Sequence, residues 1–154
     1  MMNENEESAF LNTEQNESNK SINMNIINAN ARSLNNKIGS LIDIFDELQL
    51  SAAILTETWF RSGEELSREL EALKASDNIK MVARNRRGRK GGGVAVAFDS
   101  TMLNMKEFKF PNNVYELVCA VGNSSAGNRK IAIISLYIPP KQNAAAILLS
   151  LIHI

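Results

Sequence analysis

The pattern of hydrophobic and polar positions predicts helices between strands in the first half of the chain. Positions 22–26 alternate between apolar residues and asparagines, which is typical of a strand. From Leu34 to Leu48, apolar residues recur at three- and four-residue steps, so we expect an amphipathic helix with Ser33 as its N-cap. The continuous apolar run at 52–55 then predicts a buried strand.

A second helix and a series of strands follow. Leu66, Leu70 and Leu73 share one face of a helix expected at about 64–74. Apolar runs separated by turn-forming residues predict the remaining strands, at 79–83, 93–98, 103–110, 115–121 and 131–137. This order, with helices between the early strands and a meander of later ones, favours an α/β (α+β mixed) fold of sheet layers flanked by helices.

Composition fits one globular domain. The chain has 154 residues, and 44% of them are hydrophobic, which is enough for a core. Lys+Arg and Asp+Glu are both 17, so an attraction to nucleic acid has to come from local clustering of charge. The single cysteine, Cys119, excludes a disulfide within the chain and lies in an apolar run, where we expect a small buried hydrophobe.

The ordered domain is expected at 22–140. Residues 1–21 are rich in Asn, Glu and Ser and predict a disordered polar tail, because they cannot bury enough apolar surface. The first residues lack a signal-peptide pattern, and no apolar run reaches the roughly 18 residues of a membrane helix. We therefore expect an intracellular protein, nuclear or cytoplasmic, that is neither secreted nor bound to a membrane.

Polar residues at the predicted strand ends are candidates for chemistry, because ligand groups gather there in open α/β sheets. Glu57 directly follows a buried run, and a carboxylate there suits a hard cation such as Mg²⁺; the alternative is the start of a solvated loop. Asn30 is suited to contact a phosphate or to hold a neighbouring ligand, or else to cap the next helix. The Tyr137 hydroxyl is suited to a phosphate oxygen, unless this tyrosine only packs at a strand end.

A basic stretch lies between two of the strands. It contains Arg84, Arg86, Arg87, Arg89 and Lys90. Such a cluster can bind phosphates through charge-assisted hydrogen bonds, or it can be a solvated hairpin tip. The glycines that follow are not a P-loop, because a strand comes next and the Gly-Lys-Ser/Thr signature is missing. They indicate a sharp turn or a close backbone approach.

Four segments in this order resemble the apurinic-type endonuclease domain of non-LTR retrotransposons, within the endonuclease/exonuclease/phosphatase (DNase I-like) superfamily. They are NARSLNNK, LTETW, RNRRGRKGGGVAV and SLYIPP, and the match spans about 22–140. The resemblance implies a DNase I-like two-sheet α/β sandwich with flanking helices. It also implies hydrolysis of DNA phosphodiesters with Mg²⁺ (or Mn²⁺), often in a protein fused to a reverse transcriptase.

The resemblance also assigns roles to residues of this chain. Asn30 and Glu57 would hold the metal, and Tyr137 would contact the scissile phosphate, so all three would be catalytic. DNA would be bound by a larger basic set, namely Arg32, Arg84, Arg86, Arg87, Arg89 and Lys90.

The chain also departs from the family pattern. Ile138 stands where Arg or Asn is common, and Asn85 stands where Asp is common. After Tyr137 there is no Asp or Glu, and the only histidine, His153, lies in an apolar context. The later Asp-x-Asn and Ser-Asp-His segments of the family, which supply the general base, therefore have no counterpart.

We accordingly expect a truncated domain without activity of its own, with 141–154 as a truncated end of biological or artefactual origin. Two alternatives stay open. One is a module that binds nucleic acid or protein without catalysis, and the other is a related phosphatase of the same superfamily. The arginine-rich segment before the glycines and the NARSL segment favour the nuclease. The oligomeric state is left open.

Overall fold

The computed structural model describes residues 22–61, 63–74, 76–86, 91–110, 116–126 and 129–138. The predicted tail at 1–21 and the predicted truncated end at 141–154 lie outside these residues, so both remain predictions.

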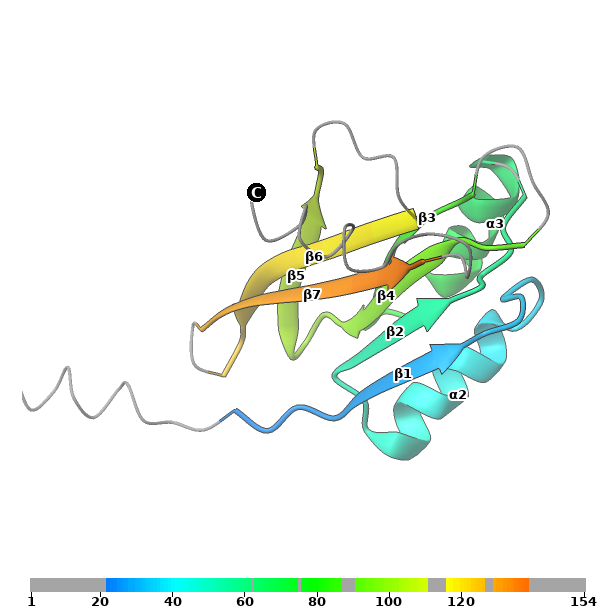
Figure 1. Cartoon of the computed structure of the whole chain (residues 1–154). Helices are drawn as coiled ribbons and strands as arrows, with labels where there is room; N and C mark the ends of the chain where they lie inside the picture. Colours follow the sequence, from blue (N-terminus) through cyan, green and yellow to red (C-terminus); the bar gives the residue numbers. More distant parts are fainter. Residues whose placement is uncertain are drawn as a thin grey trace, which may run out of the picture.

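The described strands form two sheets, as Figure 1 shows. A four-stranded sheet has the order β1-β2-β4-β3; β1 and β2 are parallel, and the other neighbours are antiparallel. A three-stranded sheet is an antiparallel meander of β5, β6 and β7. The strands are β1 Ile26–Asn30, β2 Ala52–Thr56, β3 Ile79–Arg84, β4 Val94–Asp99, β5 Leu103–Phe108, β6 Glu116–Ser124 and β7 Lys130–Tyr137.

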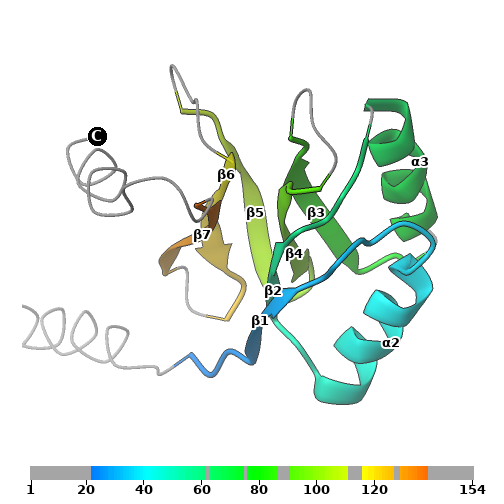
Figure 2. The same cartoon turned by 45° about the vertical axis from the view of Figure 1, so that its right-hand side comes forward.

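The elements stack in three layers (Figure 2). Helices α2 (Ile38–Leu48) and α3 (Gly63–Leu73) cover one face of the four-stranded sheet, and the three-stranded sheet covers the other. Strand β4 is therefore buried on both faces. Val94, Val96 and Phe98 point to the core between the sheets, whereas Ala95 and Ala97 point to the core under the helices. This two-sided burial explains why the strand reads as a continuous apolar run.

Helix α2 begins later than the sequence predicts. The prediction of Ser33 as N-cap is wrong: Lys37 precedes the helix without a side-chain cap, and Ser33 lies in a loop at φ +87°, where its Oγ accepts the Asn35 N–H. The helix ends at Gln49, a left-handed residue whose N–H binds the Phe45 carbonyl. Leu48 belongs to this last turn and is 53% exposed, so the prediction that it lies on the buried face is wrong.

Strand β1 also begins later, at Ile26 rather than Ile22. Its partner β2 starts at Ala52, opposite Ile26, because the residues before it form the C-terminal end of α2 and a turn. Residues 22–25 therefore have no strand beside them in this register. Met24 packs against the core between the two sheets instead.

The other predicted elements are confirmed to within a few residues. Leu73 is buried, and Leu66 and Leu70 pack against the core under the helices. Cys119 is buried, as predicted, and its burial raises the pKa of the thiol. None of the helices within the described ranges is long and apolar enough to cross a membrane.

Candidate functional site

The three predicted catalytic residues come from strands that end at the same edge of the molecule. Asn30 is the last residue of β1 and lies opposite Thr56 in the parallel register, so Glu57 follows immediately beside it. Tyr137 is the last residue of β7 in the other sheet. The arrowheads of β1, β2 and β7 point the same way in Figure 1. One end of the sandwich therefore collects a carboxamide, a carboxylate and a phenol.

Glu57 is held by a set of hydrogen-bond donors. The Trp59 indole Nε1 donates to Glu57 Oε2 at 2.5 Å, and the Gly92 N–H donates to the same oxygen at 3.1 Å. The Trp59 hydrogen bond is the main cause that lowers the pKa of Glu57; partial burial opposes it, and Tyr137, Gly92 and the Arg86 charge lower it further. The carboxylate is therefore ionised at neutral pH, as a cation ligand has to be.

Tyr137 lies near Glu57 across the two sheets, and each side chain shifts the pKa of the other. Hydrogen bonding to the Glu57 carboxylate is the main cause that raises the pKa of Tyr137, and burial adds to it. A second link between the sheets lies two residues upstream on each strand: the buried Ser135 Oγ donates to the Leu55 carbonyl at 2.9 Å. Glu57 and Tyr137 are thus held near each other by a hydrogen bond between the same two strands, two residues away.

The backbone around Glu57 is strained. Glu57 and Trp59 lie at φ +56° and +59°, and Arg32 and Ser33 in the adjoining loop lie at +43° and +87°. Such angles cost about 1–3 kcal/mol each for residues with side chains and cluster at functional sites. The two loops support each other through backbone hydrogen bonds, including Ser33 N–H to the Glu57 carbonyl at 2.8 Å. The loops after β1 and β2 are therefore held against each other beside Glu57.

Each of the three glycines before β4 has a separate reason to lack a side chain. All three have positive φ, from +74° to +85°. A Cβ on Gly91 would make only an ordinary contact, 3.7 Å from Glu57 Oε2, so its reason is the backbone angle. A Cβ on Gly92 would lie too close to the ion pair, 2.5 Å from Glu116 Oε2 and 2.8 Å from the Arg86 side chain. A Cβ on Gly93 would collide with the buried Thr58 hydroxyl and lie 3.3 Å from the Arg84 carbonyl. The predicted close backbone approach is therefore confirmed at Gly92 and Gly93, where neighbouring side chains lie against the glycine backbone.

Glu116 belongs to this end of the molecule, although the sequence analysis did not select it. It opens β6 opposite Tyr137. Its Oε1 pairs with Arg86 Nε at 2.8 Å, and its Oε2 accepts the Gly93 N–H at 2.6 Å. Both side chains of the pair are mostly buried, with 25% exposure for Arg86 and 13% for Glu116. The pair fixes the glycine turn, in which the N–H of the preceding residue, Gly92, holds Glu57.

The donor set fits a hydrated Mg²⁺. Glu57 is ionised, and Asn30 at the neighbouring strand end has an exposed side chain whose Oδ1 accepts only a local bond from the Arg32 N–H among the contacts described. No group of three or more His, Cys, Asp or Glu that could hold a metal occurs within the described ranges. Mg²⁺ does not require one, because it is commonly bound through one or two carboxylates and keeps several waters.

The predicted DNA-binding residues do not share one environment. Arg32 is exposed in the loop after β1, and Arg84 ends β3 in a half-buried position. Arg86 is committed to the ion pair with Glu116, so its guanidinium is turned towards the protein. The other three members of the basic set, Arg87, Arg89 and Lys90, lie outside the described residues.

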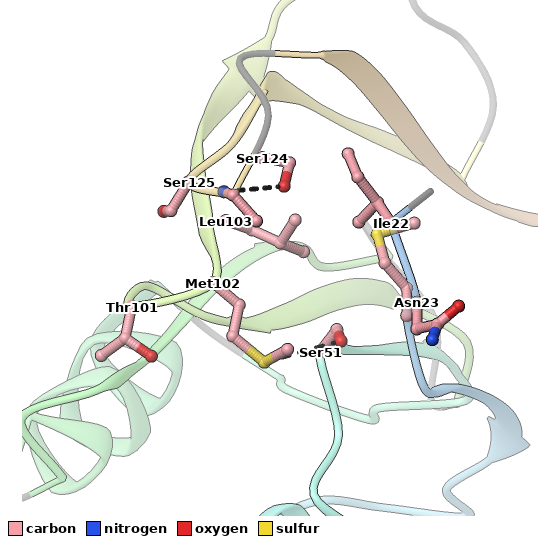
Figure 3. Close-up of a pocket in the computed structure, with 10 residues that line it drawn as sticks. Ile22, Asn23, Ser51, Thr101, Met102, Leu103, Ser124 and Ser125 are labelled. Carbon is pink, nitrogen blue, oxygen red and sulfur yellow. Dashed lines mark hydrogen bonds between the residues drawn. The ribbon is translucent and has the colours of Figure 1, made fainter. Parts of the chain in front are cut away.

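A cavity of about 340 Å³ lies at the opposite end of the sheets (Figure 3). It is bounded by the segment before β1, by Ser51 before β2 and by the turn around Met102 and Leu103. Its lining residues include no ionisable side chain. This cavity therefore offers no charged group for chemistry, unlike the end of the sheets that carries Glu57.

Comparison with known proteins identifies the fold. No protein-family model and no curated protein matches the sequence. Among solved structures, the endonuclease domain of TRAS1, a telomere-specific non-LTR retrotransposon, is 16% identical with a TM-score of 0.53, and the match covers 82% of this chain and 52% of that one. The AP endonuclease LMAP from Leishmania major is 15% identical with a TM-score of 0.53, covering 80% and 42%.

The D. rerio TDP2 complexed with single strand DNA product is 11% identical with a TM-score of 0.50, covering 83% and 54%. The chain thus spans about half the length of the structures it matches. At these identities the likeness establishes the fold, and it confirms the two-sheet α/β sandwich predicted from the sequence.

Proposed function

Because the chain has the fold of the DNase I-like nucleases and phosphatases, we propose that its site binds a divalent cation and a DNA phosphodiester as part of a hydrolytic centre. The fold similarity to two endonucleases and to a protein solved with a DNA product supports this assignment. The observation that carries it is the placement of the Glu57 carboxylate near the Tyr137 hydroxyl where strands of both sheets end, two residues from the hydrogen bond between Ser135 and Leu55.

Each residue has a defined task in this proposal. Glu57, with Asn30 beside it, would hold Mg²⁺ or Mn²⁺, which when bound offsets the negative charge of the phosphate. Trp59 and Gly92 both donate to Glu57 Oε2, which orients the carboxylate and leaves it lone pairs for a cation. Because the pKa of Tyr137 is raised, its hydroxyl stays protonated at neutral pH, and its single O–H could turn from Glu57 to donate to a phosphate oxygen.

The described residues bind and orient the phosphodiester, but they do not supply a histidine to activate water. The only histidine of the chain, His153, lies outside the described residues. We therefore assign to this chain metal-dependent binding, and we expect little or no turnover from it. Retrotransposon origin and fusion to a reverse transcriptase remain part of the proposal, with the sequence resemblance as their support.

Metal binding can be tested through the intrinsic fluorescence of the chain. Trp59 is the only tryptophan, and its indole N–H binds the proposed ligand, so a cation at Glu57 should change its emission. We expect a saturable change on titration with Mg²⁺, lost in Glu57→Gln and kept in Glu47→Gln, an exposed carboxylate on α2. An identical titration curve for Glu57→Gln and the unmodified chain would refute the proposal.

A further inference from the structure

Trp59 presents an open aromatic face beside the proposed phosphate site. Its large side chain is 41% exposed, whereas the next residue, Phe60, is buried in the core with 3% exposure. Exposure of a single apolar side chain needs no explanation by itself. This side chain, however, is also held in a fixed position.

Two hydrogen bonds and a strained backbone fix the position of the ring. The indole N–H is bound to Glu57 Oε2, and the Trp59 backbone N–H donates to the Gly92 carbonyl at 2.9 Å. The backbone itself is in the left-handed region at φ +59°, which is rare for a bulky residue. The polar N–H of the indole is thus bonded to the protein, while 41% of the residue stays exposed.

A ring fixed in this way is suited to stacking. Every nucleobase has a π-face, so an immobilised aromatic ring binds bases with little sequence preference and little loss of side-chain entropy. A positive charge that could pair with the phosphates of the same nucleic-acid strand lies nearby. It belongs to the exposed Arg32, in the loop that is hydrogen-bonded to the Glu57 segment. A nucleotide whose phosphate reaches Glu57 and Tyr137 would bring a base or sugar close to Trp59.

We propose that Trp59 is a stacking platform for a nucleobase next to the bound phosphodiester, so that it contacts substrate as well as orienting Glu57. This inference rests on the proposed function, because it needs a phosphate at the same site. The stacked group would be an unpaired or displaced base. Glu57 and Tyr137 contact only the cation and the phosphate and do not recognise this part of the ligand.

The experiment compares two oligomers of equal length and charge, an oligothymidylate and an abasic deoxyribose-phosphate chain, with Mg²⁺ present. Stacking predicts that only the oligothymidylate quenches the emission of Trp59. It also predicts tighter binding of the oligothymidylate, by roughly 5- to 150-fold, since a stacked base contributes about 1–3 kcal/mol. Equal affinities without quenching would overturn the stacking role and leave the phosphate site intact, whereas no binding of either oligomer would overturn both proposals.

Substitutions separate stacking from a purely positioning role. Trp59→Phe keeps an aromatic face but loses the N–H, whereas Trp59→Leu loses both. With labelled oligomers and anisotropy as the readout, we expect Trp59→Phe to retain most of the preference for bases and Trp59→Leu to abolish it. If both variants lost the preference equally, the N–H bond to Glu57 would be the whole role of Trp59 and stacking would be refuted.

Discussion

The substitution Gly93→Ala tests how the glycine turn is packed against the site. Two costs add in this variant. An alanine at φ +85° is in the left-handed region, which costs about 1–2 kcal/mol. Its Cβ would also collide with the hydroxyl of Thr58, which is fully buried, and overpacking of this kind costs about 1–3 kcal/mol. We therefore expect the free energy of unfolding to fall by about 2–5 kcal/mol in total.

A double-mutant cycle separates the two costs, measured by urea unfolding followed by circular dichroism. In a Thr58→Ala background the collision is removed, so Gly93→Ala should cost only the backbone part, about 1–2 kcal/mol. Gly39→Ala is the matched control: a Cβ there meets nothing within 4 Å, and alanine in a helix is favoured over glycine by up to about 1 kcal/mol. Equal costs of Gly93→Ala in both backgrounds would refute the packing argument, and so would a cost near zero.

Three further changes test the contacts that align the site. Ser135→Ala removes the buried hydrogen bond to the Leu55 carbonyl and should cost about 1 kcal/mol in urea unfolding; an unchanged midpoint would contradict this. Glu116→Ala leaves the mostly buried Arg86 unpaired and should cost about 2–3 kcal/mol, more than Glu116→Gln; equal costs would show that the charge is irrelevant. The pKa of Glu57 is lowered from 4.5, so the stability that its charge contributes is present above pH 4.5 and is lost as the pH falls through the folded pKa. In metal-free buffer, the stability advantage over Glu57→Gln should therefore shrink as the pH is lowered below 4.5, and a constant difference would contradict this.

The fold was predictable because its strands are buried in characteristic ways. The runs that became β2 and β4 are apolar on both faces, and Leu66, Leu70 and Leu73 repeat with the helical period. The errors lie where tertiary contacts decide the local structure. Ser33 looks like a helix cap, but the loop it occupies is held by backbone bonds to the segment after β2, which no local pattern reveals.

The candidate site was predictable in part for the same reason. Glu57 stood out because it follows a buried run, and Glu116 had the mirror-image signal, a carboxylate directly before the buried run 117–120. The role of Glu116 depends on contact between the start of β6 and the glycine turn before β4 in the other sheet. This contact joins residues that are far apart in the sequence. Arg86 was expected to bind DNA, and its pairing with Glu116 could not be seen without the coordinates of both sheets.

In the proposed site, Glu57, Asn30 and Tyr137 surround one divalent cation and one phosphate group. Crystals of the chain soaked with Mn²⁺ and a short oligothymidylate would locate both ligands, the cation by its anomalous scattering. We predict an anomalous peak bonded to the Glu57 carboxylate at about 2.0–2.2 Å, as for hard cations with oxygen ligands, and a phosphate within hydrogen-bonding reach of the Tyr137 hydroxyl. A peak bonded elsewhere, or no peak at Glu57 at saturating Mn²⁺, would contradict the account.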